Sequence, residues 1–282
     1  MPIHEEAYVA WEGAVLERPK TWLVIARTGV RLVWRKLLVV VLIFSSVPFI
    51  VRAGQIYFAS RAGVQSVLEG LGGGMRIDAG FFMSFMNGQV FALLVVVALC
   101  GAGLIAGDRR YKALPLYFAR PVNFVDYTLG KFLIVAFYGS LITIAPGILL
   151  FIMQVLLTAQ PGYVSGNYWI PLSVIVSGAL ALVVLGGVML AVSAYARGIR
   201  SAVVAYFAVA YVPDLVANIM EGFRDIGWIS VRRDIRQVTA ALFGGENPYE
   251  FPVWVGALAL VVIVCLCVML LRMRIKPTEV VK

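Results

Sequence analysis

Charged and metal-binding side chains are scarce in this sequence. Only 14% of its 282 residues are charged and 61% are apolar, whereas a typical soluble domain is about one quarter charged. There is a single histidine, His4, and there are three cysteines, so ligands for zinc, copper or haem are nearly absent. The composition therefore excludes an ordinary soluble domain and argues against metal chemistry.

The signatures of catalysis are missing as well. The cysteines, Cys100, Cys265 and Cys267, lie inside apolar runs and form neither a secreted disulfide framework nor a CxxC pair. No GxxxxGK[ST] phosphate loop occurs, and Gly130-Lys131 lacks both the upstream glycine and the Ser or Thr. The apolar runs hold no Ser/His, Cys/His or paired-carboxylate set. We therefore predict a chain that is not an enzyme, with no catalytic, cofactor-binding or metal-binding residues.

Long apolar runs are abundant. A helix needs about 20 mostly apolar residues to cross the hydrocarbon of a bilayer, and six stretches qualify: 37–57, 80–105, 132–157, 169–195, 201–220 and 252–271. No long polar segment separates them, so we predict an all-α protein with one membrane domain over residues 1–282. Pro213 and Asp214 interrupt the fifth stretch, where we expect a break or a re-entrant turn.

The distribution of Lys and Arg predicts the orientation of the spans. Six spans place both termini on one side, and the segments on that side carry 17 of the 24 Lys and Arg residues, against 7 on the other side. Because positive residues are retained in the cytoplasm, we expect both termini to be cytoplasmic. The net charge of +9 then reflects orientation and contact with lipid headgroups, and we expect no nucleic-acid partner.

A basic amphipathic helix is predicted before the first span, within the cytoplasmic residues 1–36. One face of its helical wheel carries Lys20, Arg27, Arg31 and Arg35. The opposite face carries Trp22, Ile25, Ala26, Gly29 and Val33. Pro19 suits the first turn of a separate helix. We expect this helix to lie in the membrane interface; the alternative is a polar extension of the first span.

The segment 106–131, between the second and third spans, combines charge with apolar residues. It opens with Asp108, Arg109 and Arg110 and turns at Arg120-Pro121. Its middle holds Leu114, Leu116, Tyr117 and Phe118. A loop that only reversed the chain would not place these side chains in water, so we expect a partner or the membrane surface to cover them. The alternative is positive-inside anchoring with interfacial aromatic residues.

This segment resembles the corresponding part of the ABC type-2 permeases, the membrane subunits of a class of ABC transporters. An acidic residue and an arginine end the second span, a leucine-rich short helix and an Arg-Pro-Val turn follow, and a Gly-Lys pair enters the third span. The matching residues are Asp108, Arg109, Leu114, Leu116, Arg120, Pro121, Val122, Tyr127, Gly130 and Lys131. Family members commonly have Gly-Thr where this chain has Lys112 and Ala113, and Pro115 is unusual there. The six spans and the N-terminal helix fit the same family over the full length.

The resemblance implies that the segment is a coupling helix docked in a groove of a cytoplasmic ATPase. The coupling residues would be Asp108, Arg109, Arg110, Leu114, Leu116, Phe118 and Arg120. For the charged residues Arg109, Arg110 and Lys112, headgroup contact is an equal alternative. ATP and Mg would be bound by two partner ATPase subunits, and a second permease, a copy or a homologue, would complete the substrate pathway. The implied function is an exporter subunit in a bacterial inner membrane, with membrane lipid as a further partner.

The outer segment 221–251 contains a further helical pattern. Apolar residues recur at helical spacing at Trp228, Val231, Ile235, Val238 and Leu242. The other faces carry Arg232, Arg233, Asp234 and Arg236. Gly244 and Gly245 supply a stop. We expect an interfacial or re-entrant helix, as the resemblance also implies, that serves either in surface packing or as a gate.

Only two ionisable residues, Arg52 and Asp214, fall within the expected spans, each near an outer end. We expect Arg52 to reach the outer headgroups. Asp214 either caps the break after Pro213 or forms an outer gate. No series of carboxylates crosses the membrane, which argues against proton coupling.

Other classes of function remain as alternatives. A secondary transporter or channel is expected to show internal repeats or charged midplane residues, and the sequence has neither. An intramembrane enzyme lacks its catalytic set, whereas a purely structural membrane subunit fits the same composition. Copurification with an ATPase separates the ABC permease from the other classes.

Overall fold

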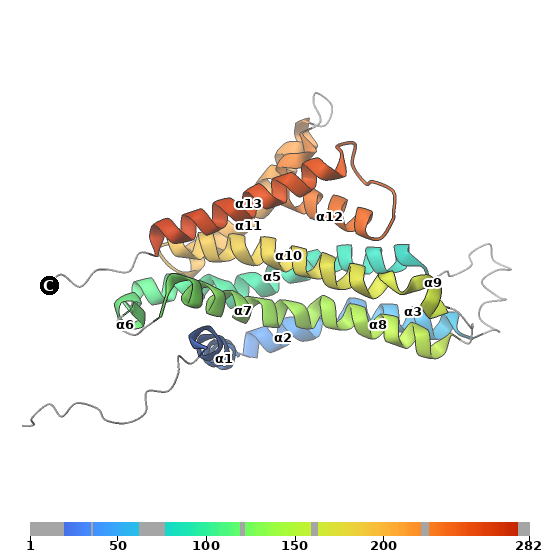
Figure 1. Cartoon of the computed structure of the whole chain (residues 1–282), viewed down its shortest axis with the longest axis horizontal. Helices are drawn as coiled ribbons and strands as arrows, with labels where there is room; N and C mark the ends of the chain where they lie inside the picture. Colours follow the sequence, from blue (N-terminus) through green and yellow to red (C-terminus); the bar gives the residue numbers. More distant parts are fainter. Residues whose placement is uncertain are drawn as a thin grey trace, which may run out of the picture.

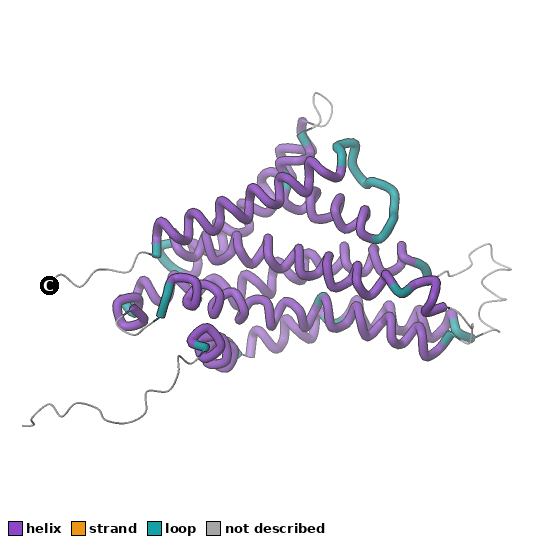
Figure 2. The backbone as a smooth tube through the Cα atoms, in the orientation of Figure 1, coloured by secondary structure: helices purple, strands orange, loops and turns teal. Residues whose placement is uncertain are grey.

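The computed structural model describes residues 20–34, 36–61, 77–118, 122–158, 163–220 and 226–275. This part of the chain is almost wholly helical and has no strand (Figure 2). The elements are α1 (Thr21–Val33), α2 (Lys36–Ser45), α3 (Val47–Ala59), α5 (Ala79–Arg110), α6 (Leu114–Phe118), α7 (Phe124–Ile142), α8 (Ile144–Leu157), α9 (Tyr163–Asn167), α10 (Trp169–Tyr195), α11 (Ile199–Met220), the 3-10 turn η1 (Gly227–Ile229), α12 (Val231–Leu242) and α13 (Val253–Arg274).

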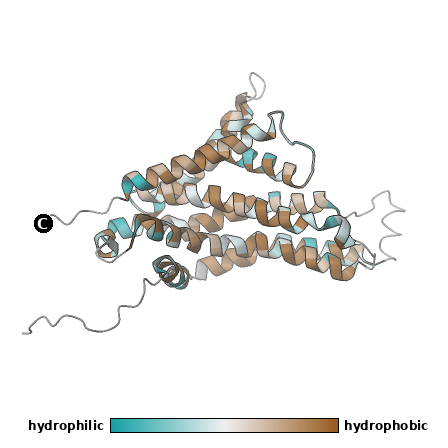
Figure 3. Ribbon diagram, in the orientation of Figure 1, coloured by the Kyte–Doolittle hydropathy of each residue, from teal (hydrophilic) through white to brown (hydrophobic). Residues whose placement is uncertain are grey.

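Six helical segments are long and apolar enough to cross a membrane. Three of them are the single helices α5, α11 and α13. The other three combine two helices each: α2 with α3 (Leu38–Ala59), α7 with α8 (Phe124–Leu157) and α9 with α10 (Tyr163–Tyr195). Apolar residues line all six, as the brown ribbons of Figure 3 show. The predicted all-α, multi-pass membrane architecture is confirmed.

Two helices extend beyond the apolar stretches that predict them. α5 continues to Arg110 and α7 already begins at Phe124, so Asp108 and Lys131 lie within helices rather than in a loop. α5 ends where Lys112 adopts a left-handed φ of 52°. There the amide of Ala113 donates to the carbonyl of Asp108 at 2.8 Å, which satisfies one of the last free carbonyls of the helix.

The break expected in the fifth span is absent. α11 runs without interruption from Ile199 to Met220, with Pro213 inside the helix. A proline removes one backbone hydrogen bond and crowds the preceding turn, but neighbouring helices help a membrane helix to tolerate this loss. The expected break at Pro213 was therefore wrong, and Asp214 does not cap a helix end.

The centre of the bundle is formed by α5 and α10, which pack against each other. In the most apolar stretch of each of these two spans, 67% of the residues are buried. The corresponding share is 11% for α2 with α3 and 17% each for α11 and α13. α7 contacts both central helices. The peripheral spans, which are α2 with α3, α11 and α13, consequently turn most of their apolar side chains away from the protein, as lipid-facing helices do.

The connecting segments gather at two ends of the bundle. At the left of Figure 1 lie α6 and the final turn of α13, with α1 beside them, and we refer to this as the α6 end. α9 and the start of α5 lie at the opposite end. The spans run along the picture, whereas α1 is seen nearly end-on, so α1 lies across the bundle.

Candidate functional site

An ion pair joins two spans at the α6 end. The Lys131 ammonium on α7 lies 2.7 Å from Oδ2 of Asp108 on α5, and the two side chains are only 8% and 19% exposed. The Tyr127 hydroxyl donates to the same carboxylate oxygen at 2.7 Å. A buried ion pair has a large desolvation cost that good geometry and further hydrogen bonds must offset. The hydroxyl of Tyr127 provides such a bond here.

The ion pair also holds the short helix α6. The rings of Tyr117 on α6 and Tyr127 on α7 meet edge to face with centroids 5.3 Å apart. The Lys131 ammonium lies 5.4 Å from each of these two ring centroids, close enough for a cation-π attraction to both. We call Asp108, Tyr117, Tyr127 and Lys131 the α6 clamp, because together they link α6 to α5 and α7.

The α6 helix presents one leucine inward and one outward. Leu114 packs against the main apolar core, whereas Leu116 is 73% exposed. Pro115 occupies the first turn of α6, a position where the missing amide hydrogen costs nothing. The side chain of Phe118 and all of Arg120 lie outside the described residues. Of the predicted coupling residues, Leu116 is therefore the one apolar side chain described here as available to a partner.

The two arginines that follow Asp108 lie differently. The Arg109 guanidinium donates to the carbonyl of Ala194, near the end of α10. Arg110 lies over the ring of Tyr111 at 5.9 Å. Arg109 therefore links α5 to α10, while Arg110 remains near the surface of the α6 end.

The N-terminal helix α1 lies tightly across α7. A Cβ added at Gly130 would lie 2.8 Å from Ile25 and 3.0 Å from the carbonyl of Trp22, and one added at Gly29 would lie 2.0 Å from Ile134. Gly130 thus permits a close backbone approach, and a larger residue at position 29 would require Ile134 to move. The Tyr138 hydroxyl also donates to the Val30 carbonyl at 2.6 Å. α1 is consequently a packed element, and its predicted apolar face is the one that meets α7.

A cavity of about 530 Å³ separates α1 from the α6 clamp. α1 contributes apolar side chains, Thr21 and Thr28 to its wall, and Asp108, Tyr117 and Lys131 line the side opposite α1. Both charged members of the clamp therefore border a space that also touches α1. A movement of α6 would reach α1 through this shared wall or through α7.

A second polar cluster lies where α11 meets α12. The Asp214 carboxylate accepts from the Arg232 guanidinium at 2.9 Å and from Nε of Arg233 at 3.2 Å. It also accepts from the Ser230 hydroxyl at 3.2 Å, and Ser230 caps the start of α12. Asp214 thus fastens α12 to α11.

The α12 helix is buried on more sides than its pattern predicts. It contacts α13, α10, α11 and α5, and four of its polar side chains are at most 5% exposed: Arg233, Asp234, Gln237 and Thr239. The helical pattern places the charged residues of 232–236 on faces other than the apolar one, and the structure buries two of them, Arg233 and Asp234. The buried Gln237 side chain is hydrogen-bonded, since its amide nitrogen donates to the carbonyl of Phe251 at 2.7 Å.

Asp234 is the functional candidate that the sequence did not reveal. Its side chain is fully buried, and neither carboxylate oxygen has a hydrogen-bond partner among the residues that the structure describes. Burial raises the pKa of Asp234 from an ordinary 3.8 to about 8, because desolvation disfavours the charged carboxylate. The only signal in the sequence is an acid among arginines on one helix, which usually indicates a solvated face.

Comparison with known proteins adds no relative. No family model matches the sequence, and no curated protein is significantly similar to it. Among the described residues, no group of three or more His, Cys, Asp and Glu side chains could hold a metal ion.

Proposed function

We propose that the chain is the permease subunit of an ATP-driven ABC transporter of the exporter type. The observation that carries the proposal is the α6 helix, which exposes Leu116 to a partner while the α6 clamp ties it to two spans. A short rigid helix held in this way can transmit a push from a bound ATPase to α5 and α7. The resemblance of the segment 106–131 to the coupling region of ABC type-2 permeases supports the same role.

The proposed assembly contains two ATPase subunits and a second permease. ATP and Mg bind the ATPases, which dock at the α6 end on the cytoplasmic side of a cell membrane. The substrate pathway lies between the two permeases, because one set of six spans is too few to enclose a large amphiphile. The first and fifth spans are the proposed contact, by the family resemblance. Both leave apolar faces for a partner, since only 11% and 17% of the residues in their most apolar stretches are buried.

The proposed assembly also assigns roles to α1, α12 and Asp214. α1 is the cytoplasmic interfacial helix, and α12 is the re-entrant or interfacial helix of the outer side. Asp214, which holds α12 to α11, is the proposed outer gate residue. A change in the ATPase dimer would thus pass from α6 through the spans to the α12 region.

Copurification with a candidate cytoplasmic ABC ATPase from the same organism tests the proposal. The two proteins, coexpressed with a tag on the permease alone, should elute together and hydrolyse ATP in proteoliposomes. An ATPase whose phosphate-loop lysine is replaced should still bind but should not hydrolyse ATP. A secondary transporter, a channel or a structural subunit would instead leave the ATPase in the unbound fraction, and that result would reject the permease assignment.

A further inference from the structure

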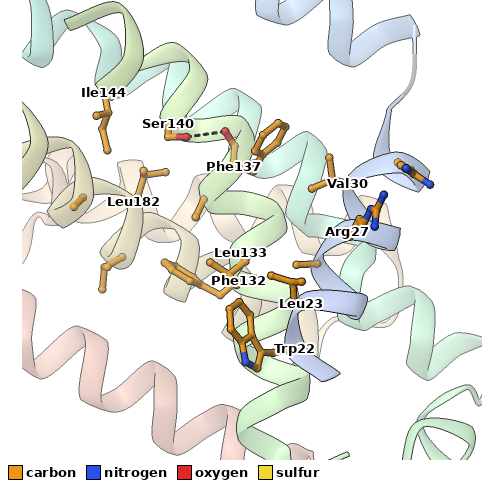
Figure 4. A pocket seen from close by; sticks show the side chains of 15 residues that line it. Trp22, Leu23, Arg27, Val30, Phe132, Leu133, Phe137, Ser140, Ile144 and Leu182 are labelled. Carbon is orange, nitrogen blue, oxygen red and sulfur yellow. Dashed lines mark hydrogen bonds between the residues drawn. The ribbon is translucent and has the colours of Figure 1, made fainter. Parts of the chain in front are cut away.

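An open apolar groove lies between α1 and the helices α7, α8 and α10. Its volume is about 790 Å³, within the range of about 300 to 1,000 Å³ typical of small-molecule sites. Figure 4 shows its wall of aromatic and aliphatic side chains, including Phe132, Phe137 and Leu182. The one hydroxyl in the spans that line it, Ser140, donates to the Phe137 carbonyl of its own helix at 2.9 Å. The groove therefore offers almost no unsatisfied polar group along its length.

The length and position of the groove match one leaflet of a bilayer. Along α7 and α8 the lining extends from Phe132 to Ile144, which is about 18 Å of helix. The hydrocarbon of a bilayer is about 30 Å thick, so this is slightly more than half of it. The groove begins at α1, which lies across the bundle, and continues along the spans.

Two arginines border the groove at its α1 end. Arg27 and Arg31 both line it and stand four residues apart, on the same face of α1. Both side chains are exposed, and none of the described residues that line the groove is acidic. Within the described residues, neither guanidinium forms an ion pair. A pair of free guanidinium groups is well suited to a phosphate, which can accept two parallel hydrogen bonds from each of them.

We infer that this groove is a binding site for an anionic phospholipid that stays with the protein. The headgroup phosphate is held by Arg27 and Arg31, and one acyl chain fills the space between α7 and α10. Charge selects the headgroup, because a zwitterionic lipid offers the arginines no net negative charge. The inference concerns the resident lipid and does not depend on the proposed transport function.

Fluorescence quenching at Trp22, which lines the groove, can report the occupant. The full chain is placed in phosphatidylcholine nanodiscs that contain an equal low mole fraction of brominated phosphatidylglycerol or brominated phosphatidylcholine. Bromine quenches tryptophan at contact, and the share due to Trp22 is the quenching lost in the Trp22→Phe variant. We expect the brominated phosphatidylglycerol to quench Trp22 several-fold more strongly than the brominated phosphatidylcholine.

Two matched double variants test the headgroup. Arg27→Gln with Arg31→Gln should reduce phosphatidylglycerol quenching to the phosphatidylcholine level. Arg197→Gln with Arg200→Gln removes the same charge from two exposed residues that do not line the groove, and should retain the preference. Equal quenching by the two lipids in the unmodified chain, or the same loss in both double variants, would overturn the inference.

A third variant tests the acyl chain. Ala179 lines the groove and is partly exposed, so Ala179→Phe should lower quenching by both lipids. Size-exclusion chromatography identifies any variant that fails to fold, and Arg27→Lys with Arg31→Lys then serves as the variant that should keep part of the preference. Displacement of the brominated lipid by glycerol phosphate, which has no acyl chain, would contradict a lipid site and indicate a soluble anion.

Discussion

Lys131 and Asp108 lie 2.7 Å apart across the junction of two spans, and neither side chain is more than 19% exposed. Asp108→Asn leaves the lysine ammonium buried without its counter-charge, which costs about 3 to 5 kcal/mol when a buried pair is broken in this way. We therefore expect a clearly lower melting temperature in detergent. Lys131→Met should cost less, because Asp108 keeps the hydrogen bond from Tyr127.

Combining both changes distinguishes the interaction between Asp108 and Lys131 from the interactions of each residue with its surroundings. Asp108→Asn with Lys131→Met removes both charges and should recover much of the stability lost in Asp108→Asn alone. The measurement is a double-mutant cycle of unfolding free energies or melting temperatures. Strict additivity of the two single effects would show that the contact contributes no coupling.

Leu116→Ala should weaken binding of the proposed ATPase partner without unfolding the chain. Burial of a leucine side chain contributes about 1.5 to 3 kcal/mol, so its removal should reduce affinity by about tenfold to a hundredfold. Addition of Phe118→Ala should reduce it further. Affinity measured by microscale thermophoresis with the purified ATPase gives the comparison.

Leu156→Ala is the matched control for that experiment. Leu156 is 77% exposed, close to the 73% of Leu116, but it belongs to α8 rather than α6. Its change should leave ATPase affinity unaltered. If Leu116→Ala with Phe118→Ala binds the ATPase normally and transports, α6 is an interfacial anchor and not a coupling helix.

The membrane orientation can be read from two single cysteines. Tyr111 is 78% exposed at the α6 end, and Gly166 in α9 has no neighbouring atom near an added Cβ. After Cys100, Cys265 and Cys267 are replaced by alanine, Tyr111→Cys and Gly166→Cys should each be placed singly in that background. An impermeant maleimide added to intact cells should label only the cysteine at 166, and labelling of the one at 111 would reverse the proposed orientation.

The packing of α12 should weaken as the pH rises. The unfolded chain loses the Asp234 proton near the ordinary pKa of 3.8, whereas the folded chain retains it up to a pKa of about 8. The stability that protonated Asp234 contributes is therefore fully present below pH 3.8. It declines between pH 3.8 and about pH 8, above which the folded carboxyl is also ionised. Melting temperatures measured over this range should fall for the unmodified chain.

Asp234→Asn should remove this part of the pH dependence. The amide cannot ionise and occupies nearly the same volume, so the difference in melting temperature between variant and unmodified chain should shift in favour of the variant as pH rises. Glu246→Gln is a suitable control, because Glu246 is an exposed acid in the segment after α12. A constant difference between Asp234→Asn and the unmodified chain at all pH values would contradict the buried, proton-retaining carboxyl.

The spans could be predicted from the sequence because a bilayer demands long apolar helices, which leave an unambiguous pattern. The helix ends could not. Hydropathy records where apolar residues stop, but α5 continues through Asp108 to Arg110 because its backbone hydrogen bonds persist after the apolar run has ended. At Pro213 the rule that proline interrupts a helix predicted a break, whereas tertiary packing keeps α11 continuous.

Contacts between distant residues were equally hidden. The sequence placed Asp108 and Lys131 in one segment but did not indicate that they pair, since their approach depends on how α5 packs against α7. The burial of Asp234 depends on α13 and other helices that surround α12, and a helical wheel contains no information about more than one neighbour. The inner face of α1 was predictable because only one helix, α7, forms most of its contact.

The spans fall into two lengths, and this difference bears on the thickness of the membrane. Three segments of 22 residues measure about 33 Å and match a hydrocarbon layer of about 30 Å. The other three, of 32, 34 and 33 residues, measure about 48 to 51 Å and must tilt or protrude. Asp108 lies about 20 Å along α5 from its midpoint, beyond the half-thickness of about 15 Å. Hydrophobic mismatch would therefore act on the α6 clamp, so that lipids with longer acyl chains would draw it toward the bilayer and shorter ones would leave more of it in water.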